Sequence, residues 1–179
     1  MTQAKVETVR RMLDAFNRDD IEAVIAAFDD DCEIVEPPEM PDSPAVGYRG
    51  HAGVRDWMGN LRGVTDARFE ARSITPSGDR LLCELASTGL GQASGVAVEW
   101  VTYAVVELRG GKVKRIHVFL SEAEALEAMP PAAREPLTQA FEAARRRPTD
   151  AGSLAPFSRL LHAWEQWEAA HQAYLRARS

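Results

Sequence analysis

The chain contains 179 residues, of which 45% are hydrophobic and 27% are charged. This length allows one domain with a hydrophobic core, and the composition is unlike that of a disordered or membrane-spanning chain. A formal net charge of −6 argues against a protein that binds nucleic acid, because phosphate contacts need a basic surface. We expect a cytoplasmic protein with no signal peptide and no membrane-spanning segment.

Residues that commonly bind metals are few and poorly spaced for that purpose. The two cysteines, Cys32 and Cys83, form no CxxC motif and no cluster with histidine. We therefore expect neither a disulfide scaffold nor a structural zinc site. The adjacent aspartates at 29–31 lack the spaced ligands and the glycine of a calcium loop, so a solvated turn is predicted there. We expect no metal and no other cofactor.

Hydrophobic residues recur every three or four positions in the N-terminal third, which is typical of helices with one buried face. Helices are predicted over residues 6–16 and 21–28, and a third begins at Gly50. Between the second and third helices, Cys32–Glu36 has the composition of a strand, which Pro37 ends. The Pro- and Gly-rich loop that follows is long enough to form the rim of a cavity.

The hydrophobic period changes to two between residues 67 and 120, which predicts strands at 67–74, 79–89, 96–109 and 112–120. Two adjacent glycines at 110–111 predict a tight hairpin, because the primed turns need positive φ at both central positions. The segment therefore predicts a curved antiparallel sheet.

Helices are predicted again beyond residue 120. Ser121 and Glu124 fit a capping box, and a longer helix is expected over residues 132–147. A further helix starts at Pro156 and has a strong apolar stripe, which consists of Phe157, Leu160, Leu161, Trp164, His171 and Tyr174. That stripe must pack against the same domain or against a partner chain.

Four segments in this order resemble the SnoaL-like branch of the nuclear transport factor two-like superfamily, which includes ketosteroid isomerases. They are residues 9–17, 21–32, 48–57 and 106–116. The resemblance covers about residues 5–128 and implies an α+β cone, in which a curved antiparallel or mixed sheet wraps around three N-terminal helices and encloses a pocket. It also implies a homodimer formed through the outer face of the sheet.

This resemblance divides the chain into two parts. Residues 1–128 are expected to form the SnoaL-like cone domain. Residues 129–179 are expected to form a C-terminal helical extension, which packs on the domain or on a dimer partner. Because the superfamily includes isomerases, dehydratases, hydrolases, cyclases and binding proteins, function has to be argued from the pocket.

The alternation of side chains along the strands predicts which residues face that pocket. One face of strand 96–109 carries no charge and is therefore expected to face inward, and burial of Ile34 places Glu36 on the inner side as well. The expected ligand is a small hydrophobic molecule. Core packing remains the alternative for each of the predicted lining residues, which are Met12, Phe16, Trp57, Met58, Trp100, Thr102, Ile116 and Val118.

Glu36 is the candidate catalytic acid or base. A carboxyl group among apolar side chains should have a raised pKa, which suits proton transfer near neutral pH. Ketosteroid isomerases carry their general-base aspartate at about this position, just before a proline. The alternative is a carboxylate at the rim, either solvated or paired with Arg49. His117 is a second-rank candidate, since the alternation places it on the outer face with Arg115 and Phe119.

Known residue sets of the superfamily are incomplete in this chain. Met12 and Ala104 stand where the resemblance to ketosteroid isomerases implies a tyrosine and a protonated aspartate. Ser121 stands where the polyketide cyclases carry an aspartate, and the inward strand positions offer no arginine for epoxide hydrolysis. Two hypotheses remain: a cofactor-independent isomerase, dehydratase or cyclase that uses Glu36, and a non-catalytic dimeric module that binds a ligand or another protein.

Overall fold

The computed structural model describes residues 2–40, 43–44, 46–92 and 95–145. Its helices are α1 (Thr2–Asn17), α2 (Ile21–Ala26), α3 (Gly50–Val64), α4 (Glu122–Glu127) and α5 (Pro131–Arg145). Its strands are β1 (Phe28–Val35), β2 (Tyr48–Arg49), β3 (Arg68–Ser77), β4 (Arg80–Leu90), β5 (Ala97–Arg109) and β6 (Lys112–Phe119).

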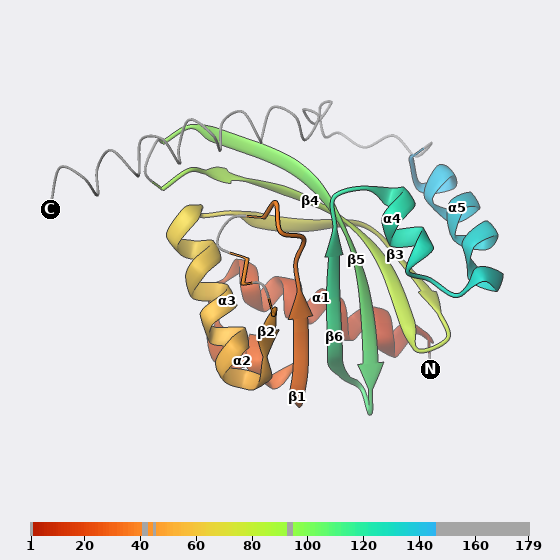
Figure 1. Ribbon diagram of the computed structural model, residues 1–179, viewed down its shortest axis with the longest axis horizontal. Helices are drawn as coiled ribbons and strands as arrows, with labels where there is room; N and C mark the ends of the chain where they lie inside the picture. Colours follow the sequence, from red (N-terminus) through yellow and green to blue (C-terminus); the bar gives the residue numbers. More distant parts are fainter. Residues whose placement is uncertain (1, 41–42, 45, 93–94, 146–179) are drawn as a thin grey trace, which may run out of the picture.

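The six strands form one sheet in the order β2-β1-β6-β5-β4-β3. β1 and β6 are parallel, and the other neighbours are antiparallel, so the sheet is mixed. The sheet curves around α1, α2 and α3, as Figure 1 shows. This arrangement confirms the predicted α+β cone. No helix in the described part of the chain is long and apolar enough to cross a membrane.

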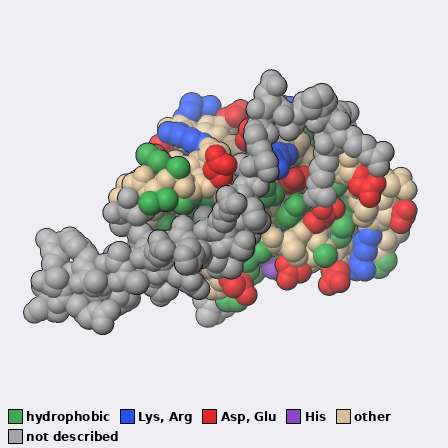
Figure 2. All heavy atoms as spheres, turned by 90° about the horizontal axis from the view of Figure 1, so that it is seen from above, with side chains coloured by type: hydrophobic (Ala, Val, Ile, Leu, Met, Phe, Trp, Pro, Cys, Tyr) green, Lys and Arg blue, Asp and Glu red, His purple; other side chains and the backbone are tan. Residues whose placement is uncertain are grey.

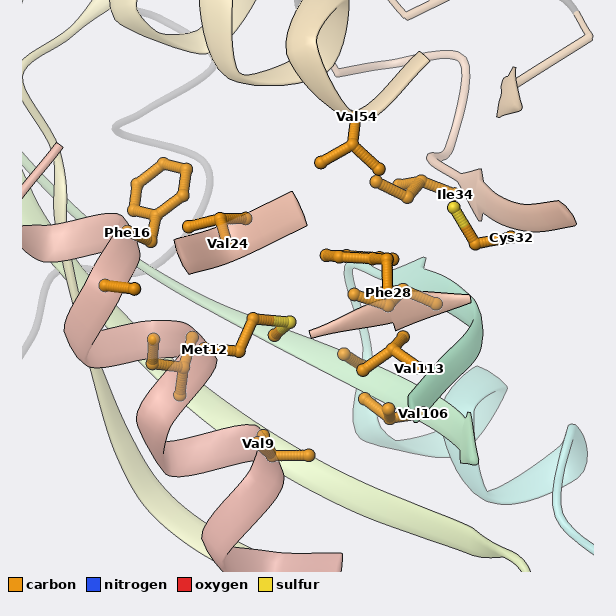
Figure 3. Close-up of a cluster of buried hydrophobic side chains, with 14 of the residues drawn as sticks. Val9, Met12, Phe16, Val24, Phe28, Cys32, Ile34, Val54, Val106 and Val113 are labelled. Atoms are coloured by element: carbon orange, nitrogen blue, oxygen red, sulfur yellow. The ribbon is translucent and has the colours of Figure 1, made fainter. Parts of the chain in front are cut away.

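The N-terminal helices and the sheet share one hydrophobic core. Asp20 starts α2 by accepting a hydrogen bond from the Ala23 amide at 3.1 Å, as an N-cap residue does. The apolar faces of the helices then meet the inner face of the sheet (Figure 3). The labelled contributors are Val9, Met12, Phe16, Val24, Phe28, Cys32, Ile34, Val54, Val106 and Val113.

The predicted turn at the three aspartates is wrong, because all three residues lie in β1. Aspartate is rare in strands, but here distant basic residues compensate its charge. Arg109 donates to Asp29 through Nε at 3.1 Å and through Nη2 at 2.6 Å, and it also binds Asp31 together with Lys114. The hydrogen bond from Arg109 is the largest cause that holds the pKa of Asp29 far below its ordinary value.

The Gly110-Gly111 hairpin is confirmed, with φ values of 60° and 83°. β2 was not predicted, and it lies at the end of the rim loop, where Ile34 pairs with Tyr48. Gly47 precedes it at φ 69°, and a Cβ there would lie 2.6 Å from the Ile34 carbonyl oxygen. The close approach of these two backbones therefore requires glycine at this position.

Helices α4 and α5 cover part of the outer face of the sheet. Ser121 caps α4 by accepting from the Glu124 amide at 3.3 Å, as predicted. Leu137 and Phe141 of α5 are buried against the outward side chains Leu82 and Val105. The described start of the predicted extension thus packs on the domain. Its remainder, residues 146–179, with the apolar stripe that starts at Phe157, lies outside the described residues.

Charged side chains of both signs cover much of the described surface, and Figure 2 shows them interspersed on the face seen from above. On the outer sheet face, opposite charges alternate across five strands. Arg49, Glu33, Arg115, Glu107 and Arg80 are successive partners in the strand register from β2 to β4. Opposite charges in directly facing positions stabilise such a register.

Candidate functional site

A cavity lies between α1, α3 and the inner face of the sheet. It brings together Glu36 and seven of the predicted pocket residues, which are Met12, Phe16, Trp57, Trp100, Thr102, Ile116 and Val118. The uncharged face of β5 and the inward face of β6 therefore meet the side chains of α1 and α3, as the alternation of side chains predicted.

Ala104 and Val106 also line the cavity and belong to the uncharged face of strand 96–109 that was expected to face inward. Several other lining residues were not predicted, namely Val9, Leu13, Met40, Leu61, Phe69, Cys83 and Leu85. Those of β4 follow from the strand register, because Cys83 pairs with Ala104 and Leu85 pairs with Thr102. If the predicted strands 79–89 and 96–109 had been paired from the sequence, Cys83 and Leu85 would have been placed beside the inward residues of the second strand. Met40 comes from the rim loop, for which the sequence carries no periodic signal.

Two predicted residues lie elsewhere. Met58 is 2% exposed, but it belongs to the hydrophobic core and does not line the cavity. It follows Trp57 on α3, and consecutive helical residues are rotated by about 100°, so both cannot face the same way. His117 lies on the outer side of β6, where its ring contacts that of Phe119, with centroids 4.1 Å apart and planes tilted by 38°. Burial, with a smaller effect from Arg115, lowers the pKa of His117.

Glu36 follows the last residue of β1, and its carboxylate accepts a hydrogen bond from Trp57 Nε1 at 2.9 Å. Burial of the carboxyl group raises its pKa, and the hydrogen bond from Trp57 lowers it by a smaller amount. The net result is a raised pKa. Arg49 does not act as the partner considered for Glu36, since its Nη2 atom binds Glu33 Oε1 at 2.9 Å.

Four aromatic rings form a continuous series along the cavity. Trp57 and Phe16 have ring centroids 5.5 Å apart, Phe16 and Phe69 are 5.1 Å apart, and Phe69 and Trp100 are 6.4 Å apart. All four line the cavity. Rings at these separations attract one another and provide a stiff apolar wall, which suits a hydrophobic ligand.

The cavity is narrow. Its volume is about 50 Å³, measured as the space open to the centre of a water-sized sphere. This is enough for a few waters or a small ligand, because one water needs about 10–15 Å³ on this measure. A ring-sized ligand would have to displace flexible lining side chains. Met12 and Met40 are suited to this, since methionine has three rotatable bonds and adapts its shape readily.

The chemistry that this lining supports is restricted. Met12 and Ala104, the residues that the sequence resemblance aligns with the donors of ketosteroid isomerases, both line the cavity, and neither side chain can donate a hydrogen bond. Cys83 is fully buried, and burial raises the pKa of its thiol to about 12, so it stays protonated and is a poor nucleophile. In the described part of the chain, no group of three or more His, Cys, Asp or Glu side chains could hold a metal ion.

Comparison with known families identifies the class of protein. Residues 9–116 match the SnoaL-like domain family, and this match spans more than half of the chain. The chain therefore belongs to the SnoaL-like family, as the sequence segments indicated. A search of curated proteins found none that matches.

Many solved structures share the fold. One is TerC co-crystallised with polyporic acid, at 21% identity over 69% of this chain and 96% of that chain, with a TM-score of 0.60. A putative polyketide cyclase from Xanthomonas campestris pv. campestris is 18% identical over 69% of this chain and 94% of that chain, with a TM-score of 0.59.

A third structure is the epoxide hydrolase/cyclase-like enzyme SalBIII, described with a role in pyran ring formation in the polyether salinomycin. It is 20% identical over 68% of this chain and 93% of that chain, with a TM-score of 0.56. At such identities these likenesses show the fold alone, and the reaction has to be argued from the cavity.

Proposed function

We propose that this protein binds a small hydrophobic metabolite in the cavity and that Glu36 transfers a proton to or from it. The reaction would be an isomerisation, a dehydration or a cyclisation without a cofactor. One observation carries this proposal: a carboxyl group that burial makes less acidic lies among apolar side chains in a cavity. A carboxyl group of this kind exchanges protons more readily near neutral pH than an ordinary glutamate does.

The hydrogen bond from Trp57 supports the same role. It engages Oε1 of Glu36 at 2.9 Å and so fixes the orientation of the carboxyl group. Proton transfer would then use Oε2. The apolar walls would exclude water from the reacting atoms once a ligand fills the cavity, which strengthens electrostatic effects there. The fold neighbours that are described as a putative polyketide cyclase and as an epoxide hydrolase/cyclase-like enzyme add support for this reaction class.

Exchange of carbon-bound protons tests the proposal without knowledge of the natural substrate. 2-Tetralone is a suitable probe, because it is a small hydrophobic ketone with exchangeable α-protons that NMR can follow in D2O. We expect the protein to accelerate the exchange and Glu36→Gln to reduce that acceleration by about a hundredfold or more. The matched control is Glu39→Gln, the same change at an exposed position nearby, which should leave the rate unchanged.

The alternative is a non-catalytic ligand-binding module. It is favoured by Met12 and Ala104, which leave the cavity without the donors that stabilise an enolate in ketosteroid isomerases. In that case 2-tetralone would bind without faster exchange, and Glu36→Gln would keep the affinity of the wild-type protein. Such a result would overturn the catalytic role of Glu36 and would leave the cavity as a binding site.

We also propose a homodimer through the outer face of the sheet, on the side formed by β1 and β6. The charges of Glu33 and Arg115 alternate with those of their neighbours there, which suits pairing with a second copy. Sedimentation velocity at micromolar concentration should give twice the mass of the chain. If the protein remains a monomer at about 100 µM, the proposed dimer is contradicted.

A further inference from the structure

Two polar side chains on the inner face of the sheet are buried without a partner. Trp100 is 4% exposed and Ser87 is fully buried, and within the described residues neither Trp100 Nε1 nor Ser87 Oγ has a hydrogen-bond partner. A buried donor that is left unpaired lowers stability by more than a typical hydrogen bond contributes. Native structures rarely keep two such groups together, and a ligand is one explanation.

These two groups lie side by side. Ser87 on β4 pairs with Trp100 on β5 in the strand register. Trp100 lines the cavity, and Ser87 lies two residues beyond Leu85, which also lines it, so both side chains belong to the inner face. The two unpaired groups therefore occupy directly facing positions of the inner sheet face, where Trp100 lines the cavity and Ser87 lies beside it.

This pair of groups is distant from Glu36. Val35, the residue before Glu36, pairs with His117 on β6, so Glu36 lies next to the position of Val118. Val118 in turn pairs with Ala104 on β5. Trp100 is four residues from Ala104 along β5, and a strand advances about 3.3 Å per residue, which gives about 13 Å. The series of aromatic rings from Trp57 to Trp100 spans the interval between Glu36 and this pair.

We propose that Trp100 Nε1 is the hydrogen-bond donor that binds an acceptor oxygen of the ligand, with Ser87 beside it. This rests on the proposed function, since it requires that the cavity bind a ligand. The substrate class is then an apolar molecule with a carbonyl or hydroxyl oxygen at the end distant from its reacting group. Its apolar part lies along the aromatic rings and its reacting end lies at Glu36. Trp100 determines specificity for the oxygen and does not itself transfer a proton.

Two probes of the same shape test this assignment. Acetophenone carries C=O where α-methylstyrene carries C=CH2, so they differ in the acceptor alone. Their dissociation constants are measured by NMR titration with the wild-type protein and with Trp100→Phe, which keeps an aromatic ring and removes the N–H. The ratio of the two constants should shift by about fivefold against acetophenone in the variant, as expected for one neutral hydrogen bond.

A second measurement uses the wild-type protein and does not depend on how the variant folds. The indole N–H resonance of Trp100 should move downfield on addition of acetophenone and should stay in place with α-methylstyrene. If both probes bind in the cavity, with an unchanged ratio and no selective shift, the donor role of Trp100 is overturned and the cavity proposal stands. If neither probe perturbs the cavity residues, both proposals fail.

Discussion

Trp57 donates a hydrogen bond from Nε1 to Glu36 Oε1 at 2.9 Å, and this contact joins α3 to the end of β1 at the wall of the cavity. It stabilises the charged form of the carboxyl group, whereas burial stabilises the neutral form, and burial is the larger effect. The hydrogen bond therefore limits how far the pKa of Glu36 rises, and at the same time it orients the group.

Trp57→Phe should raise the pKa of Glu36 further, because the substitution removes a hydrogen bond that favours the charged form. Carbon-13 NMR of the labelled carboxyl group measures this directly. Trp100→Phe is the matched control, since it makes the same change in the same cavity at a ring that does not contact Glu36. A pKa of Glu36 that falls or stays constant in Trp57→Phe would contradict the role given to this hydrogen bond.

Glu36→Gln should stabilise the protein more at pH 8 than at pH 4. The raised pKa means that the folded state holds this proton more tightly than the unfolded state does. The contribution of Glu36 to the free energy of unfolding therefore decreases as the pH rises from the ordinary glutamate pKa through the raised one. The amide side chain of the variant stays neutral throughout and removes that dependence. Thermal unfolding of both proteins across this pH range measures the difference, and a constant difference would exclude a raised pKa.

The alternation of side chains predicted the inward side of β5, because one face of that strand carries no charge, and it placed Ile116 and Val118 together on one side of β6. The same alternation places Ile34 of β1 and Glu36, which follows the strand, on one side, and Ile34 is fully buried. Periodicity of this kind depends on the local chain alone. It therefore identified the inward residues without any knowledge of which strands are neighbours.

The remaining features depend on contacts between distant segments. The strand character of the aspartates at 29–31 follows from Arg109 and Lys114, which lie about 80 residues later in the chain. The amphipathic pattern of α5 indicates that one of its faces is buried but does not indicate the surface that covers it. The hydrogen bond between Trp57 and Glu36 likewise has no sequence signature.

Phe141→Ala should destabilise the protein by about 3–5 kcal/mol. Phe141 is fully buried under the outer sheet face, and its ring centroid lies 6.1 Å from that of Tyr103. Gln139→Ala provides the matched control, because Gln139 is exposed on the same helix and its loss should change stability by less than about 0.5 kcal/mol. If both substitutions change the free energy of unfolding in urea by equally small amounts, α5 does not contribute to the stability of the domain.

Glu33→Gln should lower stability by about 1 kcal/mol at low salt, and by less in 1 M NaCl. Glu33 pairs with Arg115 and Arg49, whose side chains are 54% and 75% exposed, so solvent screens both pairs. Burial raises the pKa of Glu33, but the two arginines together lower it by a larger amount. The net result is a depressed pKa.

The sign of the pH dependence at Glu33 is thus opposite to that at Glu36. The stability that Glu33 provides is present above the ordinary glutamate pKa and is lost as the pH falls through the depressed one. Urea unfolding at neutral pH and at pH 3 compares Glu33→Gln with the wild-type protein. A deficit that persists at pH 3 or in high salt would contradict an ionic contribution.

The central claim is that the carboxyl group of Glu36 lies in an apolar cavity and holds its proton more tightly than an ordinary glutamate. A carbon-13 NMR titration of the wild-type protein, with Glu36→Gln to assign the resonance, tests it most directly. We expect a pKa above the ordinary value of 4.5. A pKa at or below 4.5 would place the group in a solvated or ion-paired environment and would contradict its proposed role.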